Sequence, residues 1–100
     1  MMIGKGRGEM KEIVRKHIVF YGRVQGVGFR YHSYYIANSL GLTGTVKNLY
    51  DGSVEMEVQG SRAAIDELVR RLNGQRYIDI SDMSVRSMPL AEDRSFEIID

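Results

Sequence analysis

The feature that most constrains this fold is a glycine-rich segment at residues 22–30, with the sequence GRVQGVGFR. It follows an apolar run at 17–21 and precedes apolar residues at helical spacing, so the pattern predicts a strand, a tight loop and a helix. Its three glycines let the backbone turn sharply and direct several N–H groups inward, which is typical of an anion site at a helix start. Arg30 closes the segment with a guanidinium whose donors suit a phosphate.

The other apolar patterns give the order strand, helix, strand, strand, helix, strand, with a short extra strand. The predicted strands are 13–21, 44–49, 53–59, 83–88 and 94–99, and the helices are 29–40 and 62–73. The first strand is nearly continuously apolar, which predicts burial on both faces. The order predicts an α+β fold: a ferredoxin-like split βαβ sandwich with a four- to five-stranded, mainly antiparallel sheet and two helices on one face.

Length and composition limit the classes of protein that fit. One hundred residues predict one domain, at 13–100, behind a flexible tail at 1–12. The chain has no cysteine, and its two histidines have no carboxylates spaced as joint metal ligands, so we expect no metal centre. No apolar run approaches the ~20 residues of a membrane span, and no secretory signal pattern occurs, so we expect a cytoplasmic protein without a membrane partner.

Charge is unevenly distributed along the chain. Residues 1–17 hold five basic and two acidic residues, whereas the remainder holds nine basic and eleven acidic residues. The folded part is therefore not basic, and nothing in its balance calls for nucleic acid.

A polar residue far from the loop is predicted to lie beside it. In a split βαβ arrangement the two strands joined by the first helix run in the same direction, with the third strand between them. The strand ends at Gly22 and Asn48 then fall on one edge of the sheet. Asn48, 18 residues after Arg30, is thus expected to reach what the loop binds.

Two motifs at this separation resemble the acylphosphatase family. The first is G-x-V-Q-G-V-G-F-R at 22–30, and the second is L-G-L-x-G-x-V-x-N-x-x-D-G-x-V-E at 40–55. The resemblance covers residues 13–100 and implies a hydrolase, free of cofactors and metals, that splits the carboxyl–phosphate bond of acyl phosphates. It implies that Arg30 binds the phosphate and Asn48 positions the attacking water. The implied phosphate-binding loop is Arg23, Val24, Gln25, Gly26, Val27, Gly28 and Phe29, supported by Gly22 and Ser33.

Two residues depart from the family pattern. Thr45 stands where family members often have an aromatic residue, and Ser33 stands where they often have threonine. The Ser33 hydroxyl is expected to orient Asn48.

The main alternative is a non-catalytic module of the same fold, which binds acyl phosphate or phosphate or regulates a larger enzyme. An RNA-binding domain of this fold stacks bases on aromatic residues of its third strand, and residues 53–59 contain none and include two glutamates. This argues against RNA, and the partners that the resemblance implies are an acyl phosphate substrate and inorganic phosphate as product or inhibitor. We expect the protein to be a monomer.

Overall fold

The structure is a computed structural model that describes residues 12–100. Of the predicted tail at 1–12, only Glu12 belongs to the described residues, and it is exposed and pairs with Arg62. In chain order the elements are β1 (Ile13–Arg23), α2 (Phe29–Ser39), β2 (Thr43–Asn48), β3 (Val54–Ser61), α3 (Arg62–Asn73), β4 (Asp79–Met88) and β5 (Phe96–Ile98).

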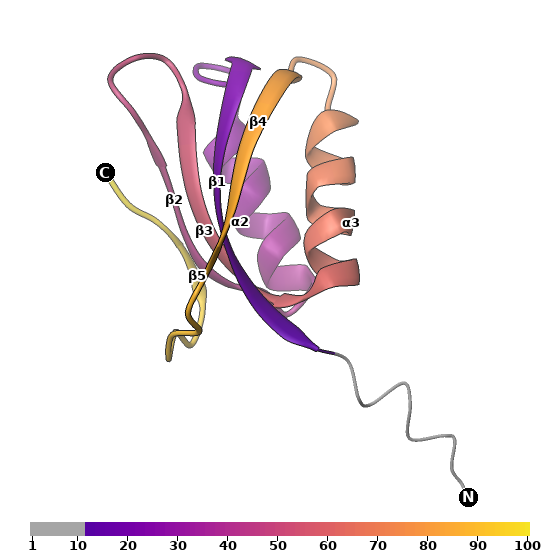
Figure 1. The fold of residues 1–100 in the computed structure, drawn as a ribbon. Helices are drawn as coiled ribbons and strands as arrows, with labels where there is room; N and C mark the ends of the chain where they lie inside the picture. Colours follow the sequence, from indigo (N-terminus) through magenta and orange to yellow (C-terminus); the bar gives the residue numbers. More distant parts are fainter. Residues whose placement is uncertain (1–11) are drawn as a thin grey trace, which may run out of the picture.

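The strands form one mixed sheet in the order β4-β1-β3-β2-β5 (Figure 1). β3 pairs antiparallel with both β1 and β2, so β1 and β2 run in the same direction on either side of it. β4 pairs antiparallel with β1, and β5 pairs parallel with β2. This arrangement confirms the predicted split βαβ topology, including the place of the third strand between the first two.

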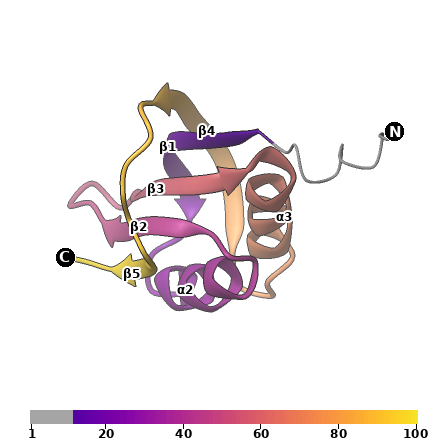
Figure 2. The same cartoon turned by 90° about the horizontal axis from the view of Figure 1, so that it is seen from below.

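Both helices cover the same face of the sheet, as Figure 2 shows. The core lies between them and the sheet, and it takes alternate residues from the three inner strands β1, β3 and β2; in β3 these are Val54, Met56 and Val58, all fully buried. The rings of Phe20 on β1 and Phe29 on α2 pack with their centroids 4.9 Å apart. This contact holds the first turn of α2 against the sheet.

The prediction that the first strand is buried on both faces is wrong. Ile18 and Phe20 of β1 are buried beneath the helices, but on the opposite face Val19 is half-buried and Tyr21 is 40% exposed. Because both helices lie on one side, they cover one face of even a central strand, and the other face is covered only in part, at Arg15. The run looks continuous in sequence because large apolar side chains are tolerated on a partly exposed face.

Three strands, β1, β3 and β4, extend beyond the predicted residues, and the shortest strand, β5, pairs with β2. β1 continues to Arg23, which pairs with Asp79 at the start of β4. β5 is placed by main-chain bonds at the edge of the sheet, where Ile99 N donates to Val46 O at 2.9 Å. The C-terminal segment therefore runs beside β2 toward the end that carries Asn48.

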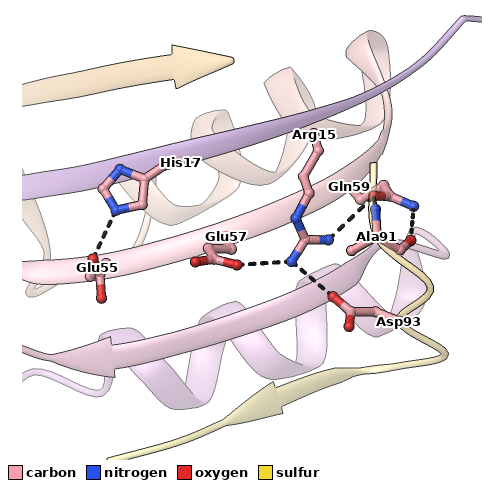
Figure 3. Close-up of polar contacts among 7 residues, drawn as sticks. All are labelled: Arg15, His17, Glu55, Glu57, Gln59, Ala91 and Asp93. Carbon is pink, nitrogen blue, oxygen red and sulfur yellow. Dashed lines mark hydrogen bonds and ion pairs between the residues drawn. The ribbon is translucent and has the colours of Figure 1, made fainter. Parts of the chain in front are cut away.

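Charged and polar side chains of β1 and β3 pair across the open face of the sheet (Figure 3). Arg15, whose side chain is 5% exposed, donates to Glu57 and pairs with Asp93, both at 2.9 Å. Gln59 bonds both the N–H and the carbonyl of Ala91 at 2.9 Å. These contacts fix the segment between β4 and β5 across the sheet, and this segment delivers β5 to its position beside β2.

A second pair on this face involves a histidine. His17 Nε2 lies 2.8 Å from a carboxylate oxygen of Glu55, and Lys47 lies 3.5 Å from the other oxygen. The contact with His17, with Lys47 as a further cause, lowers the pKa of Glu55. His17 therefore belongs to the structural pairing of the open face.

Candidate active site

The loop between β1 and α2 is shaped by glycines in the left-handed region. Gly26 and Gly28 have φ angles of 74° and 80°, which side chains with a Cβ rarely adopt. Gly28 is the residue before α2, and no side chain caps the helix there. The N–H groups of the first helical turn are therefore left for another acceptor, and the positive end of the helix favours an anion.

This loop forms one side of a cavity of about 220 Å³. The cavity is lined by Val24, Gly26, Gly28, Phe29, Arg30, Tyr31, Asn48 and Ile98. Arg30 and Asn48 meet there because β1 and β2 run in the same direction and end at the same edge of the sheet, as Figure 1 shows. The cavity thus combines main-chain N–H groups, one guanidinium and one neutral amide.

Arg30 is the second residue of α2, and its side chain is about one-third exposed. One terminal nitrogen donates to a carboxylate oxygen of Asp100 at 2.8 Å. The guanidinium therefore already binds one oxyanion, the carboxylate of Asp100, whose side chain is 89% exposed. A phosphate that binds Arg30 has to share or replace this contact.

The side chain of Gln25 ties the loop to the turn that follows Asn48. Its amide nitrogen donates to the carbonyls of Leu49 and Ser53 at 2.6 and 2.8 Å. The turn is itself held by Asp51, which accepts from the main-chain N–H and the hydroxyl of Ser53, and these bonds lower the pKa of Asp51. The two halves of the cavity are therefore connected directly.

The family model described as Acylphosphatase matches residues 16–98 of this sequence. The chain belongs to the acylphosphatase family. The match spans the loop, Arg30 and Asn48, and it confirms the predicted enzyme class, a hydrolase of acyl phosphates.

Individual relatives agree in sequence and in fold. A curated acylphosphatase from Bifidobacterium longum is 49% identical over 82 residues, which are 81% of this chain and 84% of the relative. The crystal structure of acylphosphatase from Bacillus subtilis matches with a TM-score of 0.81 at 33% identity, over 89% of this chain and 100% of that chain. HypF from T. kodakarensis matches with a TM-score of 0.74 at 33% identity, over 85% of this chain and 12% of its own.

The residues that the sequence predicts for the acylphosphatase site divide into two groups. Six of the predicted site residues line the cavity: Val24, Gly26, Gly28, Phe29, Arg30 and Asn48. Val24 and Phe29 have buried side chains, so their contribution to a ligand is confined to the main chain. Five do not line it: Gly22, Arg23, Gln25, Val27 and Ser33. Gln25 acts on the site through its bonds to the neighbouring turn.

Ser33 does not make the contact expected from the sequence. Its hydroxyl is fully buried on the inner face of α2 and has no hydrogen-bond partner in the structure, so it does not orient Asn48. Ser33 lies one turn beyond Phe29 and faces the same core. Its small size fits the packing of that helix face.

The predicted site residues do not include Tyr31, Ile98 or Asp100, although the sequence also offers Tyr31, Tyr34 and Tyr35 as an aromatic cluster that can line an acyl-binding rim. Tyr31 follows Arg30 directly, which was the available signal, although a tyrosine on a helix surface is common. Ile98 lines the cavity and Asp100 contacts Arg30 because β5 pairs with β2, and a three-residue strand gives no sequence signal for its partner. Within residues 12–100, no three His, Asp or Glu side chains lie together as metal ligands. None of the helices in this range is long and apolar enough to cross a membrane.

Neutralising Asp100 is expected to strengthen phosphate binding. The carboxylate competes with an anion for Arg30, and exposed ion pairs of this kind are worth up to about 1 kcal/mol. Asp100→Asn should therefore lower the dissociation constant of inorganic phosphate by about two- to five-fold, measured by NMR titration. Glu92→Gln makes the same change of charge in the segment between β4 and β5, and it should leave the constant unchanged. Equal constants in all three proteins would show that Asp100 does not compete.

Removing the side-chain hydrogen bonds of Gln25 is expected to lower kcat strongly and the free energy of unfolding only slightly. In Gln25→Leu the carbonyls of Leu49 and Ser53 keep their main-chain partners, so unfolding free energy should fall by only about 1 kcal/mol. The loop loses its connection to the Asn48 turn, and small displacements between reacting groups are costly, so kcat should fall about ten-fold.

Two comparisons check the role of Gln25. Gln75→Leu removes a similar amide-to-carbonyl bond at the end of α3 and should leave kcat unchanged. If Gln25 acts by placing the loop relative to Asn48, its loss should matter less once Asn48 is alanine. Additive effects of Gln25→Leu and Asn48→Ala would contradict this coupling.

Proposed function

We propose that the cavity hydrolyses acyl phosphates through Arg30, the loop main chain and Asn48. The phosphate binds to the guanidinium and to the N–H groups at the start of α2, where the helix end favours negative charge. Asn48 binds the attacking water from the neighbouring strand end. The observation that carries this proposal is that Arg30 and Asn48 line one cavity together with the glycine loop.

The reaction follows from this arrangement. Water attacks phosphorus, and the new oxygen–phosphorus bond forms as the bond from phosphorus to the bridging oxygen breaks. The carboxylate leaves with the electron pair of that bond, and the proton of the water passes to a non-bridging phosphate oxygen. An amide both donates and accepts hydrogen bonds, so Asn48 can orient the water without repelling the phosphate.

The proposed site needs no general acid. The leaving carboxylate is the conjugate base of an acid with a pKa of about 4, so it departs without being protonated. Positioning and stabilisation of charge are then the main contributions to the rate. The donors that line the cavity match this demand: main-chain N–H groups and one guanidinium for the phosphate, and one amide for the water.

The second candidate, a domain that binds acyl phosphate without turning it over, is favoured by one observation. HypF carries this fold as a small part of a much longer chain. Binding of phosphate would be the same for both candidates, so only turnover separates them.

The test is release of inorganic phosphate from benzoyl phosphate, with a metal chelator present throughout. We expect turnover at least about 100-fold above that of the Arg30→Ala variant at equal concentration. Phosphate binding at the loop without turnover would support the binding domain. A monomeric state, the lack of a nucleic-acid partner and a cytoplasmic location stay predictions, and light scattering after size-exclusion chromatography tests the first.

A further inference from the structure

Two large apolar side chains stand at the rim of the cavity. Tyr31, on α2, is 61% exposed, and Ile98, on β5, is 37% exposed. They come from different elements, and both line the same cavity as Arg30. Exposed apolar side chains that gather at a cavity are typical of ligand-binding surfaces.

The ring of Tyr31 is held in place by its neighbours. Tyr35 packs edge-on against it, with ring centroids 4.9 Å apart and planes at 73°, and Tyr34 packs against Tyr35 in the same manner. The hydroxyl of Tyr35 also donates toward that of Tyr31 at 3.3 Å. Such edge-to-face packing fixes ring orientation, so little freedom is lost when a ligand packs on the Tyr31 ring.

We propose that Tyr31 and Ile98 bind the acyl group, and that the site prefers acyl phosphates with an uncharged aromatic or branched aliphatic acyl group. The inference rests on the proposed function, which places the phosphate at Arg30. The acyl carbon is joined to that phosphate through one oxygen, so the acyl group has to lie at the rim. Asp100, beside Arg30, disfavours an acyl group that carries its own carboxylate.

The test compares benzoyl phosphate with acetyl phosphate, which carry a phenyl ring and a methyl group, respectively, on the same acyl carbon. We expect the wild-type protein to have the higher kcat/KM for benzoyl phosphate. Tyr31→Ala should reduce the benzoyl-to-acetyl ratio of kcat/KM about ten-fold, which corresponds to about 1.4 kcal/mol, and Ile98→Ala should reduce it in the same direction. Tyr31→Phe keeps the ring and should keep the ratio. Tyr77→Ala is the matched control, because Tyr77 is also 61% exposed and does not line the cavity.

The dissociation constants of benzoylphosphonate and acetylphosphonate provide a second readout that requires no turnover. If no variant or wild-type protein hydrolyses either substrate but Tyr31→Ala still weakens benzoylphosphonate alone, the proposed function fails and the acyl site stands. If the wild-type protein is active and Tyr31→Ala changes both substrates equally, the proposed function stands and the acyl site is overturned. Equal wild-type preference for the two acyl groups would overturn it as well.

Discussion

Replacing Arg30 by alanine is expected to lower kcat/KM for an acyl phosphate by at least about 100-fold. Arg30 is the only cationic side chain among the described residues that line the cavity, so nothing there replaces its charge. Arg30→Lys should recover little, because a single ammonium cannot form the two parallel bonds of a guanidinium with phosphate. The measurement is steady-state kinetics with benzoyl phosphate, alongside the dissociation constant of inorganic phosphate.

The stability of the Arg30 variants should stay close to that of the wild-type protein. Arg30 pairs with Asp100, which is 89% exposed, and surface pairs contribute at most about 1 kcal/mol. Arg62→Ala removes a comparable exposed pair with Glu12 outside this cavity and should leave kcat/KM unchanged. Near-normal activity of Arg30→Lys would contradict the assigned role, since it would mean that positive charge alone is sufficient.

Replacing Asn48 by alanine is expected to separate turnover from binding. If Asn48 orients the water, its contribution appears in the transition state, so kcat should fall at least about 100-fold. The affinity for inorganic phosphate should change by less than about two-fold, because the loop and Arg30 still hold the anion. Kinetics with benzoyl phosphate and an NMR titration with phosphate measure the two quantities on the same variant.

The control for Asn48 is Asn73→Ala, at the exposed end of α3, which should change neither quantity. Asn48 ends β2 and is half-buried, so the fold is expected to persist in the alanine variant. A collapse of phosphate affinity with kcat preserved would show that Asn48 is a binding residue and that the proposed mechanism is wrong.

The topology of the site could be predicted from sequence because it depends on strong local patterns. The glycines of the loop, the helix that follows and the turn after Asn48 each have a local signature. Two strands that are joined by a helix in this fold run in the same direction, so their C-terminal ends lie at the same edge of the sheet. Arg30 and Asn48 could therefore be brought together without any knowledge of their contacts.

The remainder of the site depends on contacts between distant segments, which leave no local signature. Gln25 looks like one more loop residue, and its bonds to Leu49 and Ser53 appear only when the turn is placed beside it. Ile98 and Asp100 lie near Arg30 because β5 pairs with β2. The expectation for Ser33 failed for the opposite reason: its position on the helix was right, but that face is turned into the core.

The most direct test of the account is a hydrolysis reaction in water enriched in ¹⁸O, followed by mass spectrometry of both products. Water that is oriented by Asn48 attacks phosphorus, so the wild-type protein should place the label in inorganic phosphate and none in the carboxylate. The reaction without protein provides the background to subtract. Label in the carboxylate would mean that water attacks the carbonyl carbon, and it would contradict the central claim that the loop, Arg30 and Asn48 act together on the phosphorus.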